Sequence, residues 1–212
     1  MRGKFITFEG PEGSGKTTQA KRLIARLEKE GRPVLYAREP GGTPTGEAIR
    51  DILQYDKAGE PICRETEVLL FAASRAQLVR HVILPALEAG RQVVCDRFAD
   101  STTAYQGFGR GFPVEQMLTI NEFAINGAHP DLTLLLDIDV GMGFERLTRR
   151  HRETASTWDR IEREERAFHE KVRQGYLELA RRWPARFRVV SAARDPDAVE
   201  QEIWDHVRRL LA

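Results

Sequence analysis

A glycine-rich stretch near the N-terminus has the residue types and spacing of a phosphate-binding loop. Residues 10–17 read GPEGSGKT: a glycine, four residues, a second glycine, a lysine and a hydroxyl residue. The apolar run 5–8 precedes it, and apolar residues at helical spacing follow it. Strand, glycine loop and helix in this order are the context in which such a pattern binds phosphate. We expect Lys16 to reach the β- and γ-phosphates of a nucleotide and the Thr17 hydroxyl to bind Mg²⁺.

Most nucleotide contacts in this stretch would come from backbone amides. Glycine adopts conformations closed to other residues, so that the amides and the helix N-terminus can point at the phosphates. The alternative is a glycine turn that merely precedes a surface helix. The residues expected to bind the nucleotide are Gly10, Pro11, Glu12, Gly13, Ser14, Gly15, Lys16, Thr17 and Thr18.

Charged residues follow two further predicted strands. Arg38 comes shortly after the apolar residues 34–36, and Asp96 and Arg97 follow the predicted strand 92–95, whose last three residues are apolar. An Asp in this position commonly helps a phosphate loop to hold Mg²⁺, although Asp96 could instead cap the next helix. Arg38 is a candidate anion ligand or simply a solvated arginine.

Phe71 and Arg75 are four residues apart in a predicted helix over 65–89 and therefore share one of its faces. The small residues between them leave room for a flat group, so that Phe71 could stack on a base and Arg75 could hydrogen-bond its edge. The alternative is a core phenylalanine beside a surface arginine. Pro85 should kink this helix.

Four arginines surround a small polar loop later in the chain. Arg149, Arg150 and Arg152 precede residues 153–158, and Arg160 follows them. A charge cluster is usually a solvated face, but a cluster interrupted by a loop also suits a lid that closes over phosphates. We refer to residues 149–160 as the lid segment.

The elements that must position these residues alternate along the chain. Apolar strands near 5–8, 34–36, 92–95, 132–136 and 187–190 are separated by amphipathic helices. This order predicts an α/β fold: a five-stranded parallel sheet with helices on both faces, in a single domain over residues 1–212. Ligands of such sheets bind beyond the carboxyl ends of the strands, where Arg38, Asp96 and Arg97 are expected to meet.

Charge, hydropathy and cysteine usage argue against a nucleic-acid-binding, membrane or secreted protein. The net charge of +1 predicts no bulk attraction to nucleic acid or membrane, and we find no apolar run long enough to span a bilayer and no signal-peptide pattern. The two cysteines, Cys63 and Cys95, form no disulfide framework, which is typical of a reducing cytoplasm. We expect a cytoplasmic protein that binds neither nucleic acid nor membrane.

Six motifs in this order make the chain similar to the thymidylate kinase family over nearly its whole length. They are FEGPEGSGKT at 8–17, REPGG at 38–42, FAASR at 71–75, DRF at 96–98, AYQG at 104–107 and DRIE at 159–162. Other mononucleotide kinases share the loop but not this set. The resemblance implies the architecture of P-loop nucleoside monophosphate kinases with a lid. It also implies phosphoryl transfer from ATP to dTMP with Mg²⁺, and a homodimer.

The resemblance also implies roles for single residues at the dTMP site. Glu12 should contact the sugar 3′-hydroxyl, and Arg38 and Arg97 should hold the phosphate. The residues implied near thymine and deoxyribose are Phe71, which should stack on the base, Arg75, which should bond its carbonyl, Thr102, Tyr105 and Gln106. Tyr105 should lie where a ribose 2′-hydroxyl would clash.

Members of this family keep a catalytic arginine either in the loop or in the lid. Because residues 11–14 of the loop include no basic residue, the resemblance implies that the catalytic arginine is in the lid segment. This resembles the bacterial type of the family. The choice among the four arginines stays open at this point; Arg150 is our first candidate and Arg160 the second. The predicted catalytic residues are Lys16, Asp96, Arg97, Arg150 and Arg160.

Two other classes of function stay open on the residues alone. A nucleoside kinase of the same fold would need a base to deprotonate a hydroxyl, whereas the phosphate of dTMP is already ionised and calls for arginines. A nucleotide-binding switch or ATPase is the second rival, although the chain contains no guanine-specifying Asn-Lys-x-Asp run.

Overall fold

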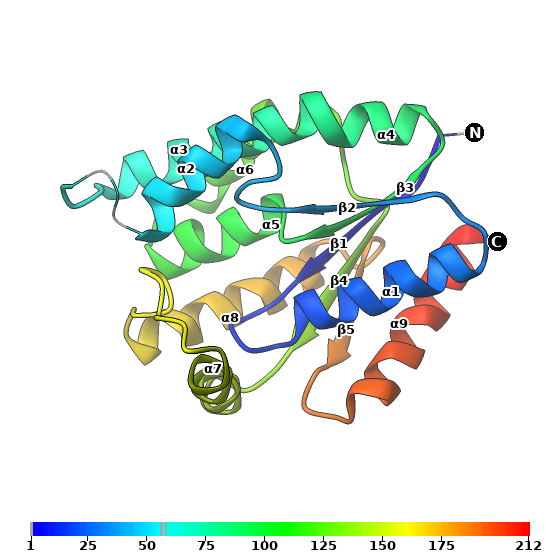
Figure 1. Cartoon of the computed structure of the whole chain (residues 1–212). Helices are drawn as coiled ribbons and strands as arrows, with labels where there is room; N and C mark the ends of the chain where they lie inside the picture. Colours follow the sequence, from blue (N-terminus) through cyan, green and yellow to red (C-terminus); the bar gives the residue numbers. More distant parts are fainter. Residues whose placement is uncertain (1, 56, 58) are drawn as a thin grey trace.

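The computed structural model describes residues 2–55, 57 and 59–212, and its centre is one parallel sheet. The strands lie in the order β2-β3-β1-β4-β5, as Figure 1 shows. Their bounds are β1 (Phe5–Glu9), β2 (Val34–Arg38), β3 (Gln92–Asp96), β4 (Leu132–Asp137) and β5 (Phe187–Ser191). The predicted five-stranded parallel sheet is confirmed.

Helices cover both faces of this sheet (Figure 1). The α-helices are α1 (Lys16–Lys29), α2 (Pro44–Tyr55), α3 (Arg64–Leu78), α4 (Leu84–Glu88), α5 (Ala99–Thr102), α6 (Val114–Ile125), α7 (Val140–Thr154), α8 (Arg166–Arg182) and α9 (Pro196–Leu211). Two π-helical stretches, η1 (Val79–Ile83) and η2 (Thr103–Gly109), connect α3 to α4 and extend α5.

The alternation of side chains along β1 explains why the sheet has two buried faces. Ile6 and Phe8 pack against α1 and α9, whereas Phe5 packs with the helices α3 and α4 on the other face. Successive side chains of a strand point to opposite faces, and all five residues of β1 are buried because helices cover both.

The strand register brings the candidate site residues to one edge. Phe8 pairs with Asp96, and Arg38 also pairs with Asp96, so the ends of β1, β2 and β3 coincide. Glu9 at the end of β1 leads directly into the loop 10–15, and Arg97 follows β3. The expected meeting of Arg38, Asp96 and Arg97 at the carboxyl edge is confirmed.

The long helix predicted over 65–89 runs from Arg64 to Glu88, with the π-helical stretch η1 directly before Pro85. Pro85 has no amide hydrogen to give to the preceding turn, so an altered hydrogen-bond pattern is expected there. By length and apolar composition this stretch could cross a membrane, contrary to our expectation from the sequence. One such helix is weak evidence, since a core helix meets the same criterion. Leu78, Ile83 and Leu87 are indeed fully buried in the core.

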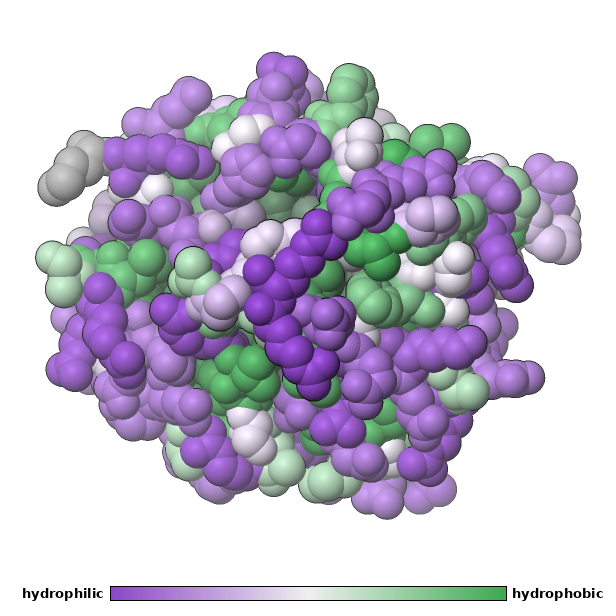
Figure 2. Space-filling model, turned by 180° about the vertical axis from the view of Figure 1, so that it is seen from behind, coloured by the Kyte–Doolittle hydropathy of each residue, from purple (hydrophilic) through white to green (hydrophobic). Residues whose placement is uncertain are grey.

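The outer surface is mostly hydrophilic on the face seen from behind, with small apolar patches between charged side chains (Figure 2). This pattern agrees with the nearly balanced charge of the sequence.

Candidate active site at the carboxyl edge of the sheet

A cleft of about 870 Å³ lies along the carboxyl edge of the sheet. Its walls are the loop 10–15 with the start of α1, the ends of β2 and β3, Phe71 of α3, the beginning of α5 and η2, and the lid segment. Residues predicted separately from six motifs therefore line one cavity.

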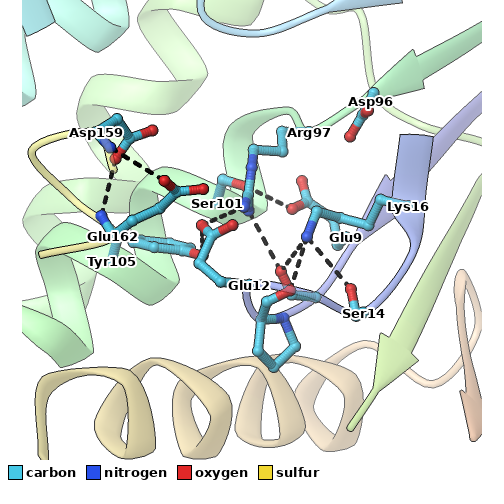
Figure 3. Close-up of polar contacts among 12 residues, drawn as sticks. Glu9, Glu12, Ser14, Lys16, Asp96, Arg97, Ser101, Tyr105, Asp159 and Glu162 are labelled. Atoms are coloured by element: carbon cyan, nitrogen blue, oxygen red, sulfur yellow. Dashed lines mark hydrogen bonds and ion pairs between the residues drawn. The ribbon is translucent and has the colours of Figure 1, made fainter. Parts of the chain in front are cut away.

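The loop 10–15 is closed around the ammonium group of Lys16. The Nζ atom donates to the carbonyl oxygens of Gly10 (2.9 Å) and Pro11 (2.8 Å) and lies 3.3 Å from the Ser14 hydroxyl (Figure 3). Burial, and then the charge of Arg97, lower the pKa of Lys16 to about 8. A phosphate near this group would restore the charge that burial disfavours.

The loop also rests directly on α7. A side chain at Gly13 would lie 2.1 Å from the Gly143 carbonyl oxygen, and a side chain at Gly143 would lie 2.4 Å from the Glu12 carbonyl oxygen. Glycine is required at both positions because the two backbones are in contact, and Gly13 has a φ of +70° as well.

Thr17 and Asp96 place two oxygen ligands together at the start of α1. The Thr17 hydroxyl donates to Asp96 Oδ2 over 2.5 Å, and Asp96 is buried. Mg²⁺ prefers few protein ligands, usually one or two oxygens in addition to substrate phosphates and waters, so this pair fits the ion. Phe98, not Asp96, occupies the N-cap position of α5, which disfavours the alternative role of Asp96.

Arg97 connects the loop to the opposite wall of the cleft. Its guanidinium forms an ion pair with Glu12 and donates to the Gly10 carbonyl oxygen (3.3 Å), and it lies 5.1 Å from the centre of the Tyr105 ring. The Tyr105 hydroxyl donates to Glu12 Oε1 over 2.7 Å. Burial alone would raise the pKa of Glu12, but the charges of Arg97 and Lys16 lower it to about 2, so that Glu12 is ionised.

Arg38 lines the same cleft at the end of β2. It donates from Nη2 to both carboxylate oxygens of Glu47 (2.9 and 2.8 Å) and from Nη1 to the Pro40 carbonyl oxygen (3.0 Å). Its pairing with Glu47 leaves the side chain about one-third exposed, so the guanidinium can still meet an anion in the cleft.

Phe71 and Arg75 share a face of α3 as predicted, but only Phe71 lines the cleft. Arg75 is buried with 1% of its area exposed, and pairs with Glu39 Oε2 through Nε (2.9 Å) and Nη2 (2.6 Å). Its Nη2 group also donates to the Thr102 hydroxyl (2.9 Å), and Thr102 lines the cleft. Arg75 therefore reaches the edge of the cleft from behind Thr102.

Gln106 is a buried residue of the cleft wall that donates from Nε2 to Glu67 Oε1 over 2.9 Å. Glu67 is in turn surrounded by cations: Arg110 Nε lies 3.2 Å from Oε1 and Arg160 Nη1 lies 2.6 Å from Oε2. Arg160 also donates from Nε to the Leu53 carbonyl oxygen (2.9 Å). The structure thus ties Arg160 to α2 and α3, and places it behind the cleft wall.

The first cluster of lid arginines has a different position. Helix α7 continues through it to Thr154, and Arg149 and Arg150 line the cleft while Arg152 is exposed to solvent. Arg150 donates from Nη2 to Glu162 Oε1 over 2.7 Å. Of the four arginines considered from the sequence, the structure therefore brings Arg149 and Arg150 to the cleft.

Comparison with known proteins decides the family. The family model described as Thymidylate kinase matches residues 8–203 of this chain. The chain belongs to the thymidylate kinase family. The thymidylate kinase of Pelotomaculum thermopropionicum is 51% identical to it over 211 residues, which are 100% of this chain and 95% of that protein.

Other thymidylate kinases match almost as closely. The enzyme of Deinococcus radiodurans is 50% identical over 203 residues, covering 96% of this chain and 95% of the relative. The enzyme of Solidesulfovibrio magneticus is 48% identical over 209 residues, covering 98% and 100%. The expected family and the P-loop kinase architecture are confirmed, and with them an enzyme that uses ATP as phosphoryl donor to phosphorylate dTMP.

The sequence reasoning missed several residues that shape this kinase site. Glu39 pairs with Arg75, Glu67 holds Gln106 and Arg160, and Glu9 and Tyr176 lie buried behind Arg97. Glu9 and Glu39 lie inside the motifs FEG and REPGG, so the sequence could have indicated that they belong to the site. Glu67 and Tyr176 carry no local pattern that distinguishes them.

Proposed function

We propose that this chain transfers the γ-phosphoryl group of ATP to dTMP, giving ADP and dTDP for dTTP biosynthesis, with Mg²⁺ as the metal. The observation that carries the proposal is the pairing of two anion sites across one cleft. The loop around Lys16 suits the phosphates of ATP, and Arg97, held against Glu12 and Tyr105, suits the phosphate of a second nucleotide.

On the donor side, we assign the phosphate contacts to residues 10–18, through the backbone amides of all of them except Pro11, and to the Lys16 side chain. Lys16 exchanges its carbonyl partners Gly10 and Pro11 for the β- and γ-phosphates, and stays charged because those phosphates replace the lost interactions. Thr17 and Asp96 are the residues that would hold Mg²⁺. When bound, the ion neutralises charge on the phosphates.

On the acceptor side, we assign the phosphate of dTMP to Arg97 and Arg38 and the sugar 3′-hydroxyl to Glu12. Glu12 is ionised and accepts hydrogen bonds, which suits a hydroxyl donor. The dTMP phosphate attacks in line without a general base, since it is already ionised. A nucleoside kinase would need such a base instead.

For the base, we assign stacking on thymine to Phe71 and a polar contact with thymine to Thr102, which is hydrogen-bonded to Arg75. For the sugar, we assign contact with the deoxyribose to Tyr105 and Gln106. Tyr105 is fixed by its bond to Glu12 and its contact with Arg97, so it cannot easily yield to a 2′-hydroxyl. A rigid wall of this kind favours deoxyribose by exclusion.

We propose that residues 149–160 act as a lid on a single domain and that Arg150 stabilises the charge of the transferring phosphoryl group. Arg150 lines the cleft and its partner Glu162 leaves it 55% exposed, so it is available to a phosphate. Arg160 was our second candidate, and its ion pair with Glu67 favours a supporting role.

We further propose a cytoplasmic homodimer that binds neither nucleic acid nor membrane. Phe123 of α6 is 89% exposed and Leu69 of α3 is 60% exposed, and α3 and α6 pack against each other, so both could lie in an interface between two copies. The unpaired thiols of Cys63 and Cys95 are consistent with a reducing compartment.

The test is an ADP-release assay with ATP, Mg²⁺ and each common nucleoside monophosphate in turn. We expect dTMP to give by far the highest kcat/KM and thymidine to give no turnover. The matched control is Lys16→Ala, which should melt like the wild type but lose at least about 3 kcal/mol of transition-state stabilisation. Equal use of thymidine, or full activity of Lys16→Ala, would refute the proposal.

A further inference from the structure

Glu9 is a fully buried carboxyl group at the end of β1, directly before the phosphate loop. Its Oε1 atom accepts from the Phe98 amide over 2.8 Å. Its Oε2 atom lies 2.6 Å from the Ser101 hydroxyl and 2.9 Å from the Tyr176 hydroxyl. Figure 3 shows the Glu9 carboxyl group between Arg97 and Lys16, and its contact with Ser101.

The three oxygen atoms around Oε2 form a closed triangle. Ser101 Oγ and Tyr176 OH lie 2.8 Å apart, so each of the three oxygens is within hydrogen-bond distance of the other two. Each hydroxyl supplies one proton, which makes two protons for three contacts. If Glu9 is ionised, both hydroxyls donate to it and face each other through lone pairs. A proton on Glu9 Oε2 supplies the third hydrogen bond and completes a ring.

The other oxygen of Glu9 fixes the turn that carries Arg97. Arg97 has a φ of +68°, in the left-handed region that is unfavourable for a residue with a side chain. Its amide donates to the Phe8 carbonyl oxygen (2.9 Å), and the next amide, of Phe98, donates to Glu9. The end of β1 therefore binds the strained turn through two consecutive amides, those of Arg97 and Phe98.

We propose that Glu9 carries a proton in the ligand-free protein up to neutral pH, that this proton closes the ring with Ser101 and Tyr176, and that the ring makes Glu9 a positioning residue for Arg97. This inference rests on the proposed function in one respect, the assignment of Arg97 to the acceptor phosphate. The proposed protonation of Glu9 depends only on its contacts and burial in the ligand-free structure.

The surroundings of Glu9 also favour the neutral acid. Burial, and then the charge of Asp100, raise the pKa of Glu9 to about 7, while Ser101, Arg97 and Tyr176 lower it. Glu9 also interacts electrostatically with Lys16, whose positive charge favours the ionised form, and with the buried Cys95 thiol. Asp100 is paired with Arg186 (2.6 Å), which holds its negative charge in place beside Glu9.

Acceptor binding then becomes linked to proton uptake. The positive charge of Arg97 is one of the groups that lower the pKa of Glu9, and a phosphate dianion on Arg97 neutralises that charge. Binding should therefore raise the pKa of Glu9, and a proton should be taken up near neutral pH. Conversely, ionisation of Glu9 above neutral pH should weaken binding of dTMP.

The direct test is a carbon-13 NMR titration of the protein labelled at its glutamate carboxyl carbons, with the Glu9 signal identified by its loss in Glu9→Gln. We expect this signal to titrate near pH 7 in the ligand-free protein, at a lower pH in Asp100→Asn, and at a higher pH with saturating dTMP. If the Glu9 signal instead titrates in the pH range that is ordinary for glutamate, Glu9 is ionised at neutral pH. That result would overturn the protonated ring. A midpoint near 7 that dTMP leaves unmoved would overturn the link to Arg97.

Kinetics give a second, independent readout. Glutamine keeps an acceptor for the Phe98 amide and a donor for the ring, so Glu9→Gln should hold the turn at every pH, whereas Glu9→Ala should raise the KM for dTMP at every pH. Relative to Glu9→Gln, the wild-type KM should rise above pH 7, by up to about tenfold per pH unit. Dividing the wild-type KM by that of Glu9→Gln at each pH cancels the effect of the titration of dTMP itself, which is the same for both proteins. A constant ratio would overturn the proposal.

The two proposals fail in different ways. If the wild type turned over no dTMP at any pH, the proposed function would be wrong, but the titration of Glu9 in the ligand-free protein would still decide the ring.

Discussion

Arg150 and Glu162 form an ion pair of 2.7 Å that joins the end of α7 to the turn before α8. Glu162 is almost fully buried and also lies 3.1 Å from His151 Nε2 and 3.0 Å from the Asp159 amide. The Glu162 carboxylate thus contacts both ends of the lid segment. Arg150 is its exposed partner and could exchange Glu162 for a phosphate.

This arrangement predicts that Arg150→Ala lowers kcat by more than about a hundredfold, because a cation that stabilises transferring phosphoryl charge contributes about 10³- to 10⁵-fold in related enzymes. Turnover at saturating ATP and dTMP is the measurement, and the KM for dTMP should change less. The matched control is Arg152→Ala, two residues away and exposed, which should stay within about threefold. Wild-type turnover in single alanine variants of all four lid arginines would exclude a catalytic lid.

Arg160→Ala should act mainly on stability. The guanidinium binds Glu67 and the Leu53 carbonyl oxygen behind the cleft wall, and its loss leaves buried acceptors without one partner, which costs about 1–3 kcal/mol. Urea unfolding measures this, and kcat below the melting range should fall far less than for Arg150→Ala. The opposite result, normal stability with a collapse of kcat, would restore Arg160 as the catalytic arginine.

The pKa of Lys16, about 8 in the free protein, predicts a pH limit for ATP use. The ammonium form binds phosphate, so kcat/KM for ATP should fall as pH rises through 8, since this parameter reports the ionisation of the free enzyme. In the pH profile of kcat, the same decline should occur at a higher pH than in the profile of kcat/KM, because bound phosphates stabilise the charged lysine. A kcat/KM that stays flat to pH 9.5 would contradict this assignment.

Tyr105 should govern the choice of sugar. Tyr105→Ala removes the wall that rests on Glu12 and Arg97 and should relax the rejection of ribonucleotides. Tyr105→Phe keeps the ring but loses the 2.7 Å bond to Glu12, and is the matched control that should keep the preference for deoxyribose. The measurement is the ratio of kcat/KM for dTMP and its ribose form. An unchanged ratio in Tyr105→Ala would show that another group excludes the 2′-hydroxyl.

Arg75→Ala should destabilise the fold as well as weaken dTMP use. Arg75 and Glu39 are 1% and 3% exposed, and removal of the arginine leaves a buried carboxylate unpaired, which costs about 3–5 kcal/mol. Calorimetry of Arg75→Ala and of Arg75→Ala combined with Glu39→Gln separates the two effects, because the second change removes the unpaired charge. Equal stability of wild type and Arg75→Ala would contradict a structural role for this pair.

Much of the fold was predictable because it depends on local signals. Apolar strands, glycine loops and helical periodicity define their own segments, and the parallel order then brings the strand ends, with Arg38, Asp96 and Arg97, to one edge. The cleft and its walls followed from that edge together with the motifs.

The partners of buried charges were not predictable in the same way. Spacing placed Arg75 on a helix face with Phe71 but could not show that this face meets Glu39, and it could not connect Arg160 to Glu67, 93 positions earlier. Glu9 and Tyr176 are 167 residues apart and meet only after α8 has packed on the sheet. Such contacts depend on tertiary packing, and no local pattern encodes them.

The contact between Gly13 and Gly143 limits how far the cleft can close. Because the two backbones already touch, the first turns of α7 cannot move closer to the nucleotide loop. Leu147, one turn further on, is also buried. If residues 149–160 close over the nucleotide as proposed, the movement has to come from the part of α7 beyond Leu147, which carries Arg149 and Arg150. Closure would then bend one end of a helix and leave its first turns in place.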